Sequence, residues 1–143
     1  MTVDDIEAGF PWGFHDADLR GFGVDLAART ATFDLDVPVD ERQTKMRSGQ
    51  LTVAGVQFVT VSPPMNDSNS EALWIDSFEG RWTADNTTLP PLAEGVFLHT
   101  FFRKEAGSVI YIAAREAAFH WTGDEFAAGS ERPTLYFPGE DLP

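Results

Sequence analysis

Apolar and polar residues alternate with a period of two along much of the chain, which is the pattern of half-buried β-strands. The clearest alternation covers residues 29–39. It places two sets of side chains on opposite faces, namely Ala31, Phe33, Leu35 and Val37 against Thr30, Thr32, Asp34 and Asp36. Residues 19–26 form a second alternating run, and only Ala27-Ala28-Arg29 separates the two runs. The pattern therefore predicts a β-hairpin.

Later runs of alternation predict further strands over 51–61, 73–82, 96–104 and 108–115. The last two flank Glu105-Ala106-Gly107, so they predict a second hairpin. Residues 117–122 either continue the second arm of that hairpin past a kink or form a strand of their own.

The segments between the runs predict loops and a few helical turns. Residues 40–48 have one apolar side chain and three basic ones, so we expect an exposed loop. Gly55 stands where the alternation of its strand slips, which indicates a bulge or a bend. Short helical turns are expected at 3–8, where Thr2 is a possible N-cap, and at 71–73 and 125–128.

These elements predict the fold class. Six or seven strands follow one another through local connections, and none of the connections holds a long helix, so a parallel β-α-β unit is not expected. A chain of 143 residues fits one domain, here residues 1–143. We expect an all-β or mainly β fold with short helical turns, in which an antiparallel meander forms a curled sheet, a barrel or a two-layer sandwich.

Charge narrows the classes of partner. The chain has 23 Asp and Glu against 10 Lys and Arg, a formal net charge of -13. Such a field repels nucleic-acid backbones and anionic membranes and favours basic proteins. The acids are dispersed, so an ordinary solvated surface is the favoured explanation of them, and a surface that steers a basic partner is the alternative. Cysteine is absent, which excludes disulfides and thiolate chemistry.

The start of the chain bears on location. Residues 2–12 include Asp4, Asp5 and Glu7, whereas a secretory leader begins with a cationic stretch before its apolar core. No apolar run approaches the roughly 20 residues that cross a bilayer. We therefore expect a soluble, cytoplasmic protein.

Candidate chemistry centres on Phe14-His15-Asp16-Ala17-Asp18-Leu19, which gathers an imidazole and two carboxylates just before the first predicted strand. These groups could ligate a divalent metal. In an extended segment, however, His15 faces away from Asp16 and Asp18, so the three converge only if the backbone turns. The structural interpretation is that Asp16 holds the backbone where the strand begins and His15 is exposed.

No second motif completes a catalytic set. His99 and His120 lie in later predicted strands, and the sequence does not say whether they approach His15. Nucleophile motifs such as G-x-S-x-G are missing, and Gly21-Phe22-Gly23 lacks the rest of a phosphate-binding loop. We assign no catalytic residue, metal or cofactor, and an enzyme is not the favoured reading.

Aromatic residues raise the question of a small ligand. Trp74, Phe78 and Trp82 share one face of their predicted strand, and Phe97 and Phe101 share a face of the next. Together they could line a pocket of the kind that small barrels enclose, or they could fill the core.

Three segments carry a resemblance to a known class of protein: Phe14-His15-Asp16-Ala17, Asp34-Leu35-Asp36-Val37 at the end of the first hairpin, and the strand from Gly49 to Val56. Over roughly residues 12–61 the chain resembles small bacterial single-domain β proteins of uncharacterised or immunity-protein-like type. The resemblance implies a bacterial, cytoplasmic domain that neutralises a toxin by binding it. It implies no catalytic residue.

Three hypotheses of function follow. The first is a non-enzymatic acidic binding module, of the immunity-protein-like kind, that recognises a basic protein. The second is a small-ligand-binding β-barrel with an aromatic-lined pocket. The third is a metal-dependent enzyme that uses His15 and Asp16. None of them involves nucleic acid or a membrane, and the sequence does not determine the oligomeric state.

Overall fold

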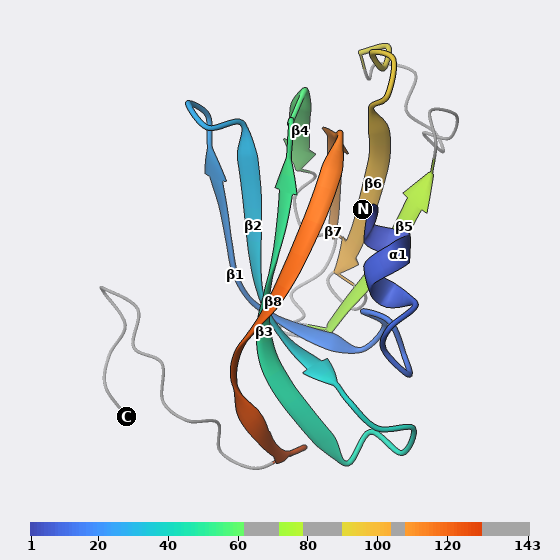
Figure 1. Cartoon of the computed structure of the whole chain (residues 1–143), viewed down its shortest axis with the longest axis vertical. Helices are drawn as coiled ribbons and strands as arrows, with labels where there is room; N and C mark the ends of the chain where they lie inside the picture. Colours follow the sequence, from blue (N-terminus) through green and yellow to red (C-terminus); the bar gives the residue numbers. More distant parts are fainter. Residues whose placement is uncertain (62–71, 79–89, 104–107, 130–143) are drawn as a thin grey trace.

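The computed structural model describes residues 1–61, 72–78, 90–103 and 108–129, with the backbone alone at 72–78, 102, 103 and 108. The described residues form one short helix and eight strands (Figure 1). In chain order these are α1 (Val3–Glu7), β1 (Ala17–Asp25), β2 (Thr30–Pro38), β3 (Lys45–Ala54), β4 (Phe58–Val61), β5 (Ala72–Phe78), β6 (Phe97–Arg103), β7 (Ser108–Ala114) and β8 (Glu116–Ala127).

All eight strands belong to one antiparallel sheet in the order β4-β7-β6-β5-β1-β2-β3-β8. The junction between β5 and β1 is short, with only Ala17 paired to Leu73 and Asp18 to Ala72. The sheet stays open, with β4 and β8 as its edges in the described part of the chain. The expected all-β class with an antiparallel, curled sheet is confirmed, and the barrel alternative is not the one adopted.

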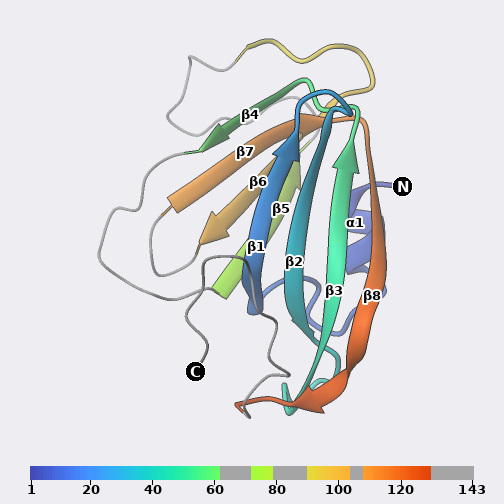
Figure 2. The same cartoon turned by 90° about the vertical axis from the view of Figure 1, so that its left-hand side faces the viewer.

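The sheet curls so that its two halves face each other. In Figure 2, β4, β7, β6 and β5 lie to the left of β1 and partly behind it, and they run at a steep angle to β1, β2, β3 and β8. Phe33 of β2 stacks on Phe101 of β6 with 4.4 Å between the ring centroids, and both side chains are fully buried. Alternation explains this core, because the apolar set predicted for residues 29–39 is the set that β2 turns inward.

The N-terminal segment covers the inner face of β3 and β8. Thr2 caps α1 through a reciprocal pair of hydrogen bonds with Asp5. Two aromatic side chains that follow the helix, Phe10 and Phe14, pack against Phe119 of β8, with ring centroids 5.1 and 5.8 Å away. The predicted helical turn at 3–8 is thus confirmed, and its role is to close one side of the core.

Both predicted hairpins are present. β1 pairs with β2 from Asp25 opposite Thr30 to Asp18 opposite Asp36, and β6 pairs with β7 along seven residues each. The alternative for residues 117–122 is also settled, because β8 is a strand of its own that pairs with β3.

Other local predictions were wrong. The predicted loop 40–48 ends early, since Lys45 already begins β3. Asp40 closes this short turn by accepting hydrogen bonds from the N–H groups of Thr44 and Lys45, at 2.8 and 2.9 Å, and from the Thr44 hydroxyl. The Thr44 hydroxyl is the main cause of the lowered pKa of the Asp40 carboxyl, followed by the backbone N–H of Lys45.

The remaining corrections concern strand ends. The bend predicted at Gly55, with φ of 67°, is confirmed, but it divides the predicted strand 51–61 into β3 and β4, which pair with different neighbours. A helical turn was expected at 125–128, but β8 continues to Ala127. Another was expected at 71–73, but residues 72 and 73 are the first two residues of β5. Residue 71 and the last four residues of the strand predicted over 73–82 lie outside the described part.

Candidate functional site

A tight turn carries the segment that the sequence singled out. Gly13 and Asp16 both adopt positive φ, at 56° and 62°, and backbone hydrogen bonds run from His15 to Trp12 and from Ala17 to Phe14. An Asp tolerates this left-handed conformation better than most residues do. The turn brings the chain into β1 with Ala17 fully buried.

The side chain of Glu7 holds the first half of this turn. Its Oε2 accepts a hydrogen bond of 2.9 Å from the backbone N–H of Phe14. A Cβ at Gly13 would collide with the same carboxylate, so a glycine is needed there for space as well as for its φ. The result is a fixed position for Phe14, whose ring is fully buried.

The second half of the turn brings His15 and Asp16 together. Nδ1 of His15 lies 3.1 Å from Oδ2 of Asp16, and each side chain is about one-third exposed. The expectation that the two residues face opposite ways was therefore wrong. The reason is the left-handed backbone of Asp16, which breaks the alternation of an extended strand.

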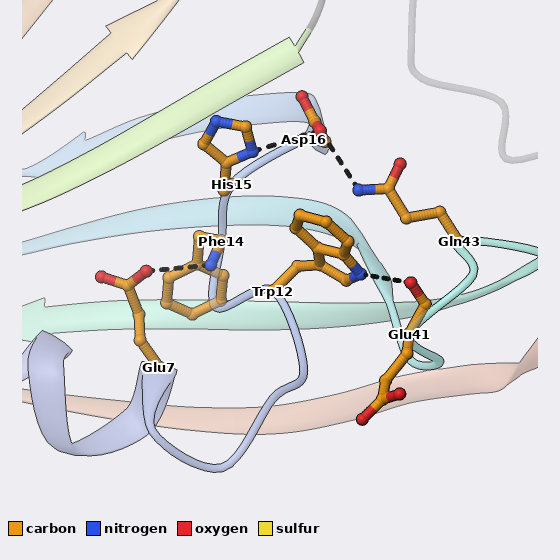
Figure 3. Close-up of polar contacts among 7 residues, drawn as sticks. All are labelled: Glu7, Trp12, Phe14, His15, Asp16, Glu41 and Gln43. Atoms are coloured by element: carbon orange, nitrogen blue, oxygen red, sulfur yellow. Dashed lines mark hydrogen bonds and ion pairs between the residues drawn. The ribbon is translucent and has the colours of Figure 1, made fainter.

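Two more hydrogen bonds tie this turn to the turn between β2 and β3 (Figure 3). The side-chain amide of Gln43 donates to Asp16 Oδ2 at 3.2 Å, and the Trp12 indole N–H donates to the carbonyl of Glu41 at 3.0 Å. The contacts described for the Asp16 carboxylate are thus to two side chains, an amide and the neighbouring imidazole, whereas the sequence predicted contacts to the backbone.

A pocket of about 300 Å³ opens beside Asp16. Its floor is a cross-strand row in register, Pro38 of β2, Met46 of β3 and Phe126 of β8. The rest of the wall consists of the two carboxylates, one amide and two small residues: Asp16, Asp18, Gln43, Ala128 and Gly129. The pocket therefore combines an apolar floor with negative charge on one side.

A polar row continues from the pocket along the same face of β2, beginning with a buried charge. Asp36 is fully buried and accepts a hydrogen bond of 2.6 Å from the Ser48 hydroxyl. Arg20, the extra residue of a β-bulge in β1, brings Nη1 to 3.7 Å from Asp36 Oδ2. Further along, Asp34 accepts a hydrogen bond from the Gln50 side chain.

The three histidines have different surroundings. His15 lies in the turn, His120 is exposed on β8, and His99 of β6 is 1% exposed within the core. Burial lowers the pKa of His99 to about 4, so its imidazole is neutral near pH 7. Among the described residues, no group of three or more His, Asp and Glu side chains could hold a metal ion.

Of the five aromatic positions proposed for a ligand pocket, Phe97 and Phe101 are the two whose side chains the structure describes. Phe101 is fully buried against Phe33, and Phe97 is partly buried. In the register of β5 and β6, Trp74 lies opposite Phe102, and Phe78 lies opposite Leu98. Neither residue of β5 is therefore paired with Phe97 or Phe101. Trp82 lies outside the described residues.

Most of the pocket was not predicted. Pro38, Gln43, Met46 and Phe126 come from one turn and three strands, and no spacing in the sequence links them to Asp16. Only the register of β2, β3 and β8 aligns the floor, and this register depends on the bulge between Arg47 and Gly49.

Comparison of the chain with protein-family models, with curated protein sequences and with solved structures found no match. No helix in the described residues is long and apolar enough to cross a membrane. Any functional conclusion therefore has to come from the site itself.

Proposed function

We propose that this protein is a non-enzymatic, acidic binding module that recognises a basic protein through the pocket beside Asp16. The observation that carries the proposal is the pairing of two carboxylates, Asp16 and Asp18, with the apolar floor of Pro38, Met46 and Phe126. A lysine or arginine side chain has the matching chemistry, an aliphatic stem that ends in a positive charge.

Charge around the pocket supports this reading. Glu41, Asp124 and Glu125 are exposed at the same end of the sheet, beside the β2–β3 turn and near the end of β8. The basic residues there are Arg42 and Lys45, which are exposed, and Arg47, which donates to the carbonyl of Gly123 at 2.7 Å and whose guanidinium lies over Trp121. Together with a net charge of -13, this field would accelerate association with a cationic partner.

The proposal also agrees with what the resemblance of residues 12–61 implies. An immunity-like protein neutralises a toxin by binding it, and it needs a recognition surface without a catalytic set. The segment Phe14–Asp18 contributes two pocket carboxylates and the turn that positions them. It would thus serve both the fold and recognition.

The test is affinity capture from the source cells with the wild-type protein, followed by measurement of Kd with the purified partner. We expect a basic protein, and we expect Asp16→Asn/Asp18→Asn to weaken its binding about tenfold or more through loss of two charges. Glu94→Gln is the matched control, because Glu94 is exposed and its backbone carbonyl binds Arg115, at the opposite end of β3 from the pocket.

Two results would contradict the proposal. One is a partner that binds the double variant as tightly as Glu94→Gln. The other is an affinity that does not change between low salt and about 0.5 M NaCl, because screening must weaken a charge-driven contact. Capture of a small cationic compound in place of a protein would keep the pocket but reject the basic-protein partner.

A further inference from the structure

β8 forms an open edge of the sheet beside the pocket. It has twelve residues, Glu116–Ala127, and none of the described strands pairs with it on the side away from β3. Figure 2 shows it as the outermost strand of the front layer. An open edge presents unpaired backbone donors and acceptors to which another strand can add.

The direction of these backbone groups can be assigned. The N–H of Ala117 donates to the carbonyl of Met1 at 2.8 Å, so it points away from β3. In an antiparallel strand this direction recurs at every second residue, which gives the same orientation to Phe119 and Trp121. In the register of the two strands, Phe119 lies opposite Leu51 of β3 and Trp121 lies opposite Gly49. The chain's first residue thus occupies one end of the edge, and no described strand pairs with Phe119 or Trp121 on this side.

The charge of the edge selects its occupant. β8 contains Glu116, Asp124 and Glu125 and no Lys or Arg. A second copy of β8 would bring like charges together, which disfavours a symmetric dimer. A strand rich in lysine or arginine would instead be complementary. The other edge, β4, has only four residues and no charged side chain.

The edge is continuous with the proposed recognition pocket. Phe126 belongs to β8 and also forms part of the pocket floor, next to the wall that holds Asp16 and Asp18. A segment that runs along β8 therefore leads to the pocket. To bring a cationic side chain to the two carboxylates, the segment would continue past the end of β8 and across the ends of β3 and β2, which lie between β8 and the strand of Asp18.

We infer that the basic partner adds an extended, lysine-rich segment to the edge of β8 as a further antiparallel or parallel strand. This inference rests on the proposed function, because the pocket carboxylates anchor one end of the segment. Backbone hydrogen bonds at Phe119 and Trp121 would position the added strand. The acidic side chains of β8 would favour a strand with basic side chains.

The test uses a short peptide of alternating lysine and valine, blocked at both ends, and NMR of the 15N-labelled protein. We expect the peptide to slow amide hydrogen exchange of Phe119 and Trp121 at least tenfold. Two further peptides carry N-methyl groups on all valines or on all lysines. Because each blocks one edge of the strand, one of them should lose binding while the other keeps it.

The outcomes separate the two proposals. If both methylated peptides bind equally, or if the Phe119 and Trp121 amides stay unprotected in the complex, strand addition is wrong while the pocket can still bind a cation. If the unmodified peptide fails to bind, strand addition is likewise rejected. If Asp16→Asn/Asp18→Asn binds the peptide as tightly as Glu94→Gln but the amides are protected, the pocket proposal fails and the edge remains a strand-addition site.

Discussion

Gly49 of β3 lies directly under the ring of Phe119 on the neighbouring strand β8. A Cβ at this position would meet the ring at distances below those of real contacts. Phe119 in turn packs with Phe10, Phe14 and Trp121, so it has little freedom to move away. One missing methyl group thus permits the aromatic cluster that closes this side of the core.

We predict that Gly49→Ala destabilises the protein by about 1–3 kcal/mol, because it overpacks a filled site. The free energy of unfolding, measured in urea, checks the value. Gly23→Ala is the matched control, since nothing lies within 4 Å of a Cβ at Gly23. An equal cost for both variants would contradict the packing explanation and would point to a general effect of glycine in strands.

Asp16 shows where reasoning from local pattern fails for a single residue. Alternation separates His15 from Asp16 by assuming an extended backbone, whereas the φ of 62° at Asp16 puts the two side chains 3.1 Å apart. The presence of a turn-forming Asp was visible in the sequence. Its left-handed conformation was not visible, nor was the hydrogen bond from Gln43, which lies 27 residues further along the chain.

Among the elements, β2 and β3 are joined by polar pairs as well as by their backbone ladder. Asp36 pairs in register with Ser48, and Asp34 with Gln50. Asp36 is fully buried, so each donor on its carboxylate offsets part of its cost of desolvation. These contacts oppose a slip in register, since a shift by one residue would remove them and expose the core face of β2.

We predict that Ser48→Ala lowers the free energy of unfolding by about 1–3 kcal/mol, because it removes one donor from a buried carboxylate. A double-mutant cycle with Asp36→Asn separates this contact from other effects of the substitution. The cost of Ser48→Ala should shrink once the charge is gone. An unchanged cost would show that the hydroxyl contributes to stability by some other route.

Strand prediction succeeded where the partner strand is next along the chain. The β1–β2 and β6–β7 hairpins follow from alternation and short connections. It failed at the start of β3, although this end also pairs with the preceding strand β2, and at the end of β8, where Phe126 pairs with Met46 of β3. The sequence separation of these two strands hides that pairing from any local pattern.

In the whole molecule, His99 is an ionisable side chain that lies buried between the two halves of the curled sheet. It is 1% exposed, and burial lowers its pKa to about 4 from an ordinary value of 6.5. The folded protein therefore keeps this imidazole neutral at pH values where an unfolded chain already binds a proton. Stability is then linked to pH through this one residue.

We predict that stability falls as the pH drops from about 6.5 to about 4, with His99 contributing about 3 kcal/mol of the loss. The sign follows because the unfolded state binds more protons in this range. Urea unfolding at several pH values should show a shallower decline for His99→Gln than for the wild type. His120→Gln, at an exposed position, is the control and should leave the slope unchanged. Equal slopes for the wild type and His99→Gln would contradict the prediction.

The sequence by itself determined the all-β class, the first hairpin, the inward set on β2 and the acidic character, because these depend on neighbouring residues and composition. Tertiary structure decided the rest. Only the curl of the sheet brought Phe33 onto Phe101, and only the register of three strands placed Pro38, Met46 and Phe126 in one row beside Asp16. Such contacts join residues far apart in the chain, and their positions follow from the packing of the whole sheet.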